Sequence, residues 1–155
     1  MRIRSVALNN RRKAFEVVAG RTSYWYPYAK LGIKPTARNR VVRAFVDREL
    51  GHEGFTYVLE SGRQGTVHIE QVLDYNQDPS YLRDALVYKL TLEAQRRVEN
   101  SSLTKREIIR RLGTSAAQFY RLIDQTNYRK SIDQLLSLLS VLECEVDFSV
   151  RAKSA

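Results

Sequence analysis

The sequence is poor in residues that build disulfide scaffolds, metal centres and membrane spans. Cys144 is its only cysteine, so no disulfide forms within one chain and no thiolate metal cluster can be assembled. His52 and His68 are the only histidines, which leaves a catalytic metal site short of ligands. No run of about eighteen apolar residues is present, and Met1–Arg4 is not followed by an apolar signal-peptide stretch. We therefore expect a cytoplasmic protein with no metal, no other cofactor and no membrane contact.

Arrangements typical of enzymes are also missing. The sequence contains no phosphate-cradling glycine loop, no metal-ligand spacing and no pair of a nucleophile with a base in a recognisable pattern. His68 lies between Val67 and Ile69 in a β-like run, where a structural or exposed histidine is a simpler interpretation than a catalytic one. We predict no catalytic residues and no enzymatic activity.

Positive charge is abundant and unevenly distributed over the 155 residues, of which 43% are hydrophobic. Residues 1–43 contain eleven Lys or Arg and one acidic residue, whereas residues 44–80 contain two basic and seven acidic residues. Residues 81–155 again have a surplus, with thirteen basic and nine acidic residues, and the net charge is +9. Such basic fields attract polyanions, so a nucleic acid is the expected partner.

Two adjacent helix starts stand out between residues 103 and 124. Thr104 with Glu107, and Ser115 with Gln118, each have the spacing of a capping box, in which two side chains satisfy free backbone donors at a helix start. Gly113 lies at the end of the first helix, where a residue that adopts positive φ is favoured. The pattern predicts two short helices that are joined by a turn of two or three residues.

Helices this short need partners, and the flanking sequence supplies them. Ser131 and Gln134 have the spacing of a third capping box, followed by a leucine-rich stripe that reaches Leu142. Upstream, Asp78 or Ser80 can cap a helix with Pro79 in its first turn, and apolar residues recur at helical spacing as far as Val98. Residues from about 81 to 142 are predicted to form a four-helix unit.

The N-terminal half has alternating rather than helical periodicity. Short β-like runs are separated by turns, and residues 60–65 are predicted to form a hairpin loop. The runs lie near residues 3–8, 15–17, 41–46, 55–59 and 67–69. The expected fold class is α+β: a small antiparallel β-rich domain over residues 1–76, with its sheet ending near Tyr75, and then an all-α helix-turn-helix domain over residues 77–155 with a short C-terminal strand.

The aromatic run Tyr24–Tyr28 leaves three interpretations open. It is a strand with alternate rings in the core, a platform on which bases stack, or a surface for a protein partner. The second and third interpretations give an additional candidate surface for nucleic acid or a partner, consisting of Arg21, Tyr24, Tyr26, Lys34 and Arg38.

The segment Leu103–Asp124, continued by Ser131–Leu136 and by Glu145–Val150, resembles the Cro/C1-type helix-turn-helix family, especially its antitoxin-like members. The junction Leu112–Ser115 is the most specific part of the match. The resemblance implies that the first helix of the motif braces against phosphates and the second enters the major groove. Ile109 departs from the small residue usual in the family, so either the two helices lie farther apart or Ile109 packs toward the N-terminal domain.

The N-terminal half resembles a small β-rich bacterial family of unknown function, which occurs alone or fused to a helix-turn-helix. The match is carried by Ile3–Val6, the Gly20-Arg21 turn and Gly62–Leu73. It implies an architecture rather than an activity.

The candidate DNA-contacting residues fall into two groups. Arg121 and Tyr120 should project from the second helix of the motif toward bases, while Gln118 either reads adenine or closes the capping box on Ser115. Residues on the first helix and on the loop after the second suit phosphate contacts. The full predicted set is Lys105, Arg106, Ser115, Ala117, Gln118, Tyr120, Arg121, Asn127, Arg129 and Lys130.

The sequence thus predicts a sequence-specific transcriptional regulator that binds double-stranded DNA, a dimeric, nucleoid-associated repressor or an autoregulating antitoxin. Two copies would read half-sites about 34 Å apart. The alternative is a protein-interaction module, whose β domain binds a toxin or another protein while the helical domain dimerises. The alternation of Val146, Phe148 and Val150 predicts strand pairing across a homodimer, which fits both hypotheses.

Overall fold

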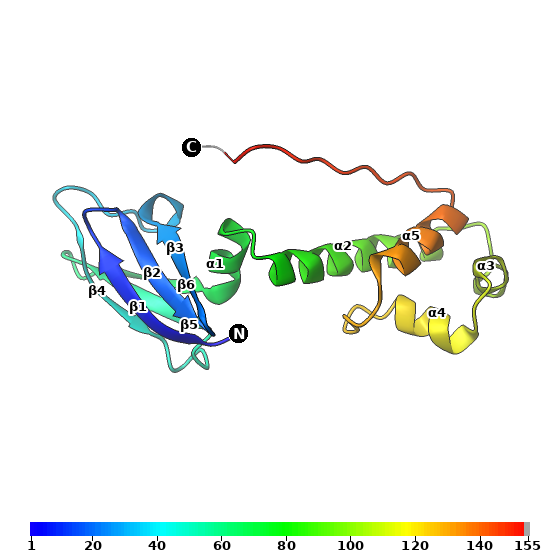
Figure 1. Cartoon of the computed structure of the whole chain (residues 1–155), viewed down its shortest axis with the longest axis horizontal. Coiled ribbons are helices and arrows are strands. Elements are labelled where there is room, and N and C mark those ends of the chain that lie inside the picture. Colours follow the sequence, from blue (N-terminus) through cyan, green and yellow to red (C-terminus); the bar gives the residue numbers. More distant parts are fainter. Residues whose placement is uncertain (154–155) are drawn as a thin grey trace. The chain divides into compact units, whose positions relative to one another are not determined.

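The computed structural model describes residues 1–153 (Figure 1). Within them the chain forms two three-stranded antiparallel sheets and five α-helices, a mixed α+β structure. The chain divides into two compact units, a β unit over residues 1–82 and a helical unit from residue 83 onward. None of the helices in residues 1–153 is both long and apolar enough to span a membrane.

The first sheet consists of β1 (Ile3–Asn9), β2 (Ala14–Ala19) and β3 (Thr22–Pro27), in that order. Phe15 and Val17 point to the core from β2, as the alternating pattern requires. The β2–β3 hairpin turns through Gly20, whose φ of 59° belongs to the left-handed region that a two-residue hairpin uses.

The second sheet consists of β4 (Val41–Val46), β5 (Gly54–Leu59) and β6 (Gln64–His68). β4 lies alongside β1, so the two sheets meet at these strands. The predicted hairpin joins β5 to β6, with Gly62 at a φ of 86°. The structure therefore has two small sheets, where the periodicity alone predicted one.

Aromatic side chains dominate the core of the β unit. The ring of Phe15 lies 4.8 Å from that of Tyr28, 5.0 Å from Phe55 and 5.7 Å from Tyr57. Tyr28 is part of η1 (Tyr28–Lys30), a short 3₁₀ turn that follows β3. The aromatic run is thus a strand and turn with alternate rings in the core, as the first interpretation predicted.

The predicted surface role of Tyr24 and Tyr26 is wrong. Their side chains are only 7% and 4% exposed, because β3 alternates and places both rings in the core of the β unit. The Tyr24 hydroxyl donates a hydrogen bond to the Asp78 carboxylate at 2.9 Å, and burial raises its pKa. Neither ring is available for stacking on a base.

The sheet ends earlier than predicted, because residues 69–75 form a helix, α1 (Ile69–Tyr75). His68 caps it: its Nδ1 accepts from the Glu70 N–H at 3.3 Å, and the Gln71 side chain accepts from the His68 N–H at 2.8 Å. Ile69, Val72 and Leu73 are buried at helical spacing. The histidine therefore has the structural role that its position favoured.

Four helices form the predicted helical region: α2 (Pro79–Glu99), α3 (Lys105–Leu112), α4 (Ala116–Leu122) and α5 (Ile132–Val141). Asp78 is the residue that caps α2, since its carboxylate accepts from the Tyr81 N–H at 3.1 Å. The helices share one aliphatic core around Phe119. Ile109 packs against this core, so the alternative that it packs toward the N-terminal domain is wrong.

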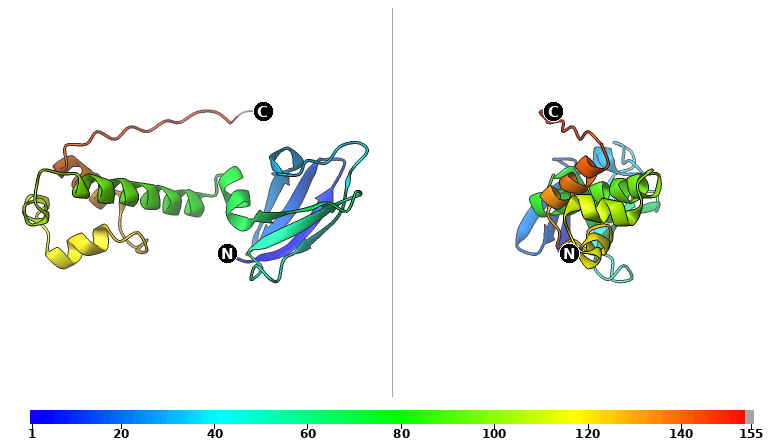
Figure 2. Two further views of the ribbon diagram at one scale, coloured as in Figure 1. Left: turned by 180° about the vertical axis from the view of Figure 1, so that it is seen from behind. Right: turned by 90° about the vertical axis from the view of Figure 1, so that its right-hand side faces the viewer.

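The short C-terminal strand predicted near residues 145–150 is not formed. After α5 the chain continues as an extended segment (Figure 2) that pairs with no strand in residues 1–153. Phe148 is 66% exposed and Val150 is 98% exposed. A strand needs a neighbouring strand that satisfies its backbone groups, and residues 1–153 of a single chain supply no such neighbour here.

Candidate nucleic-acid interface

The turn between α3 and α4 has the geometry that its residues predict. The Thr104 hydroxyl accepts from the Glu107 N–H at 3.2 Å, and the Ser115 hydroxyl accepts from the Gln118 N–H at 3.2 Å. Gly113 ends α3 with a φ of 72°, and its N–H reaches the carbonyls of Ile109 and Arg110, each at 3.1 Å. Both helix starts and the glycine stop are therefore confirmed.

Only one of the three predicted capping boxes is reciprocal. Ser131 and Gln134 exchange both hydrogen bonds, at 3.1 Å each. At α4 the box stays half made, since the Gln118 side chain forms no hydrogen bond within residues 1–153. Of the two alternatives for Gln118, the structure leaves its amide free for an external partner.

At α3 an ion cluster replaces the predicted box. Glu107 binds Arg110 and Arg111 instead of its own helix start, with the Arg111 Nε 2.9 Å from the carboxylate. Hydrogen bonds from Arg110 and Arg111 lower the pKa of Glu107 to about 2. Two of the basic side chains on α3 are thus partly neutralised, while Lys105 and Arg106 are exposed and lie within 4 Å of no carboxylate in the described chain.

Phe119 fixes which side of α4 faces outward. Phe119 and Leu122 are buried in the helical core, whereas Ala117, Tyr120 and Arg121 are exposed on the opposite side. Tyr120 is 52% exposed, and its ring meets that of Phe119 at 5.4 Å in an edge-on contact. This orientation agrees with the predicted placement of Tyr120 and Arg121.

The loop after α4 is held by side chains from α2. Arg83 donates to the carbonyls of Tyr128 at 2.6 Å and Lys130 at 2.7 Å, and Gln95 donates to the Ile123 carbonyl at 2.6 Å. These contacts lie within the helical unit and tie both ends of the loop to one rigid helix. No pattern in the sequence indicated this support, because Arg83 and Gln95 look like ordinary exposed positions.

Asn127 and Lys130 also stabilise this loop, which changes their expected roles. The Asn127 amide donates to the Arg121 carbonyl at 3.1 Å and accepts from the Arg129 N–H at 3.0 Å. Lys130 is only 4% exposed, and its Nζ donates to the carbonyls of Leu122 and Asp124, each at 2.7 Å. Burial lowers the pKa of Lys130, although the nearby Asp124 opposes this shift.

The prediction that Lys130 contacts phosphate is therefore wrong. Its ammonium group satisfies carbonyls at the C-terminal end of α4, which need donors, and it has little surface left for a ligand. Arg129 beside it is exposed and lies within 4 Å of no carboxylate in the described residues. Of the three predicted loop residues, Arg129 is the cation that remains available.

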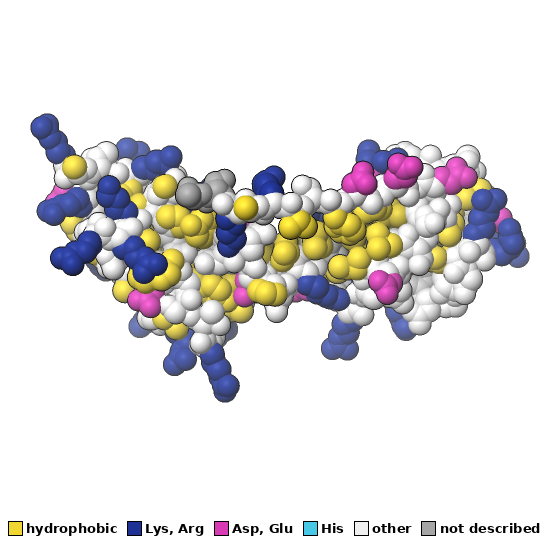
Figure 3. Space-filling model, turned by 45° about the horizontal axis from the view of Figure 1, so that its top comes forward, with side chains coloured by type: hydrophobic (Ala, Val, Ile, Leu, Met, Phe, Trp, Pro, Cys, Tyr) yellow, Lys and Arg dark blue, Asp and Glu magenta, His cyan; other side chains and the backbone are white. Residues whose placement is uncertain are grey.

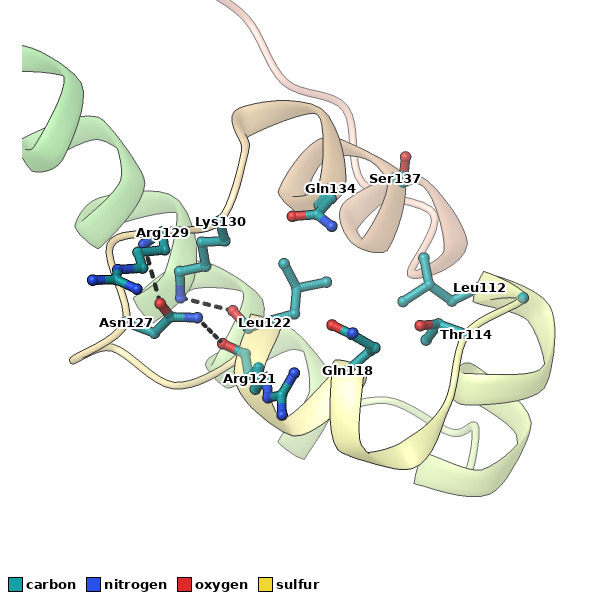
Figure 4. Close-up of a pocket in the computed structure, with 11 residues that line it drawn as sticks. Leu112, Thr114, Gln118, Arg121, Leu122, Asn127, Arg129, Lys130, Gln134 and Ser137 are labelled. Atoms are coloured by element: carbon teal, nitrogen blue, oxygen red, sulfur yellow. Dashed lines mark hydrogen bonds between the residues drawn. The ribbon is translucent and has the colours of Figure 1, made fainter.

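A concave surface that encloses about 710 Å³ lies between α4, α5, the α3–α4 turn and the loop after α4 (Figure 4). Most of its lining side chains are polar or basic, two are leucines and none is acidic. The lining residues are Leu112, Gly113, Thr114, Gln118, Arg121, Leu122, Asn127, Arg129, Lys130, Gln134 and Ser137. Gln118 and Arg121 border it from α4 and share it with exposed Arg129, whereas Tyr120, which was expected to face bases together with Arg121, does not line it.

No protein family, curated protein or solved structure matches this chain. The functional interpretation therefore depends on the geometry alone.

The remaining predicted residues are not brought to this surface. Ser115 caps α4, so its hydroxyl is already engaged, and Ala117 is exposed on α4. Arg21, Lys34 and Arg38 are exposed in the β unit. In residues 1–153 no three His, Cys, Asp or Glu side chains gather in a way that could hold a metal ion.

Proposed function

We propose that this protein is a sequence-specific regulator that binds double-stranded DNA through α3, α4 and the following loop, as a helix-turn-helix of the Cro/C1 type. The observation that carries the proposal is the capped helix pair with Gly113 in the left-handed region, which exposes Gln118 and Arg121 at one concave surface beside α4. A short helix with free polar side chains on one side fits the major groove.

The exposed side chains suit two kinds of DNA contact, with bases and with phosphates. Arg121 has the fork geometry that binds guanine O6 and N7, and the free Gln118 amide matches the donor and acceptor of adenine. Ala117 is small, which permits a close approach of α4 to the base edges. Lys105, Arg106 and Arg129 are exposed cations that suit phosphates and set the position of the protein without reading sequence.

A site-selection experiment at stated salt tests this proposal, with Arg121→Ala and Arg129→Ala as a matched pair. Arg121→Ala should cost about 1–3 kcal/mol of binding free energy and relax the preference at one base pair. Arg129→Ala should weaken binding to all sequences alike and reduce the salt dependence. Absence of any preferred site, together with unchanged affinity of Arg121→Ala, would contradict the proposal.

The exposed C-terminal segment supports a homodimer as the binding form. Phe148 and Val150 lie two residues apart and are exposed, so one side of an extended chain is apolar and its backbone lacks a partner within residues 1–153. Pairing of two such segments would satisfy both needs and place two copies of α4 on one DNA site. If the same segment also bound and blocked a toxin, the protein would be an autoregulating antitoxin.

The double variant Phe148→Asp/Val150→Asp tests the dimer, with Arg151→Asp as a control in the same segment. Sedimentation equilibrium should give a dimer for the wild type and the control and a monomer for the double variant, because paired acidic strands repel each other. A wild-type protein that is monomeric alone but captures the product of a neighbouring gene through Phe148 would instead favour the interaction-module alternative.

A further inference from the structure

The β unit contains a second cavity, of about 390 Å³, that the DNA-binding proposal does not use. It lies between the β1–β2 turn and the segment that leads from η1 to β4. Its lining residues are Asn10, Lys13, Tyr28, Ala29, Lys34, Pro35, Thr36, Ala37 and Arg40. Three of them are cations and none is acidic, and the volume falls within the range of small-molecule sites.

Hydrogen bonds hold the inner wall of this cavity in place. The buried Tyr28 donates through its hydroxyl to Asn10 at 3.0 Å, and the Tyr28 N–H reaches the Lys13 carbonyl at 2.9 Å. Asn10 in turn donates to the Val41 carbonyl at 2.9 Å. Hydrogen bonds of Tyr28 and Asn10 thus link the β1–β2 turn, η1 and β4.

A second group of hydrogen bonds shapes the loop that carries Lys34. The Tyr57 hydroxyl accepts from the Ile33 N–H at 3.1 Å and donates to the Ile33 carbonyl at 3.0 Å. Thr36 and Asn39 exchange two backbone hydrogen bonds, at 3.0 and 3.1 Å, which close a small turn. The loop is therefore fixed beside the cavity before any ligand arrives.

The charge around the cavity is not balanced from within the unit. Arg40 pairs with Glu60 at 3.2 Å, and hydrogen bonds from Arg40 lower the pKa of that carboxyl. Lys13 and Lys34 lie within 4 Å of no carboxylate in residues 1–153. Further exposed cations lie close to the lining residues in the sequence, namely Arg11, Arg12, Lys30 and Arg38, and Figure 3 shows Lys and Arg side chains gathered over the β unit. Uncompensated positive charge of this kind attracts anions.

Lys13 also has a strained backbone. Its φ of 54° lies in the left-handed region, which a lysine rarely adopts, and its carbonyl is fixed by the Tyr28 N–H. Strain of this kind persists where the surroundings impose it and is concentrated at binding sites. At Lys13 it coincides with an unpaired cation on the rim of a cavity.

We propose that this cavity binds a small phosphate ester. A phosphate group carries nearly two negative charges near neutral pH, which matches the two unpaired ammonium groups of Lys13 and Lys34. The organic part of the ligand would lie against Tyr28, Pro35 and Ala37, which give the cavity its apolar lining. The site requires nothing of the helical unit and stands whether or not α4 reads DNA.

Titration of the full chain with adenosine 5′-monophosphate, adenosine and inorganic phosphate, followed by amide NMR shifts, tests the site. The monophosphate should shift signals of residues 10–13 and 28–40, and adenosine should bind at least about tenfold more weakly because it lacks the charge-assisted contacts. Lys13→Glu/Lys34→Glu should lose at least about tenfold in affinity for the monophosphate. Equal binding of adenosine and its monophosphate would overturn the proposal.

The matched control is Arg2→Glu/Arg63→Glu, which changes the net charge equally through exposed cations that do not line the cavity. This control should leave the affinity for the monophosphate almost unchanged. A loss of affinity as large as that of the lysine variant would show that general electrostatic attraction explains the effect, and it would overturn the proposed site. Far-ultraviolet circular dichroism of both variants verifies that the fold is intact.

Phosphates of a nucleic-acid backbone offer the same chemistry, and DNA binding distinguishes the two sources. If the ligand is a small ester, Lys13→Glu/Lys34→Glu leaves the salt dependence of DNA binding as it was. If the monophosphate does not bind and the slope of log K against log salt falls by about 2 in this variant, the cavity serves the DNA backbone and the small-ligand proposal is wrong. Arg121→Ala, which tests α4 alone, keeps this outcome separate from failure of the proposed function.

Discussion

In the helical unit the exposed cations of the candidate interface lie on a capped helix and an anchored loop, whereas in the β unit they lie on turns around a cavity. Lys105 and Arg106 open a helix that Thr104 caps, and Arg129 lies on a loop that Arg83 and Gln95 hold. Lys13 and Lys34 lie beside a cavity that the buried Tyr28 lines, and the buried Tyr57 holds the neighbouring loop. Fixed helices suit a long regular partner, while a lined hollow suits a small one.

The two units also differ in what fills their cores. The β unit packs Phe15 among three other aromatic rings, whereas the helical unit surrounds Phe119 mainly with aliphatic side chains. An aromatic cluster has few ways to close a gap, while leucine and isoleucine side chains change rotamer more easily. The cost of a cavity should therefore depend on the unit in which it is made.

The largest expected effect comes from truncating these two rings in turn. Phe15→Ala and Phe119→Ala should each lower the free energy of unfolding by about 3–5 kcal/mol, with Phe15→Ala at the upper end because its neighbours relax less. Urea unfolding gives the loss, and NMR signals of Tyr28 and Tyr57 report on the β unit alone. Because the two cores are separate clusters, Phe119→Ala should leave these tyrosine signals native. Simultaneous loss of both units in Phe119→Ala would show that they fold as one.

Two glycines make a second comparison, because each is required for a different reason. A Cβ on Gly65 would overlap the Tyr57 ring, whereas a Cβ on Gly113 meets open space but has to accept a φ of 72°. Gly65→Ala should cost about 1–3 kcal/mol through overpacking. Gly113→Ala should cost about 1–2 kcal/mol through backbone conformation alone.

Thermal unfolding of both glycine variants measures these losses, and Gly113→Asn supplies a control. Asparagine tolerates the left-handed region, so it should recover part of the stability lost in Gly113→Ala. Gly65→Ala should also disturb the loop at Ile33, since the Tyr57 hydroxyl holds it, and should weaken any ligand at the cavity beside Lys34. Equal behaviour of the two alanine variants would contradict this difference in mechanism.

Local chemistry made the helix-turn-helix predictable in detail. Thr104, Gly113 and Ser115 act through backbone groups a few residues away, so their spacing predicts where α3 begins and ends and where α4 begins. The burial of Phe119 then orients α4. The sheets were predictable as strands but not as two separate sheets, because which strand pairs with which depends on contacts that are distant in the sequence.

The failures have two physical origins, namely contacts distant in the sequence and, at residues 69–75, a local helix signal that was missed. Lys130 looked like an exposed loop cation, and only the fold brings it to carbonyls at the end of α4. Residues 69–75 looked like the end of a strand run, yet Ile69, Val72 and Leu73 are spaced for a helix that His68 and Gln71 cap. The C-terminal alternation predicted a strand, but a strand needs a partner that one chain does not provide.

The smallest expected effect concerns the ion cluster on α3, where Glu107 reduces the charge that the motif offers to an anion. Its pKa is about 2 in the folded chain against an ordinary value of 4.5, so its stabilising contribution is complete above about pH 4.5 and is lost as the pH falls toward 2. Glu107→Gln should therefore lower the melting temperature slightly near neutral pH, and this difference from the wild type should narrow as the pH falls to about 3. Glu99→Gln, an exposed carboxylate with no ion-pair partner in residues 1–153, should show no such trend. A difference between Glu107→Gln and the wild type that stays constant with pH would mean that Arg110 and Arg111 are not paired with Glu107 in solution. The unpaired cations on α3 would then number four, against the two unpaired lysines at the cavity of the β unit.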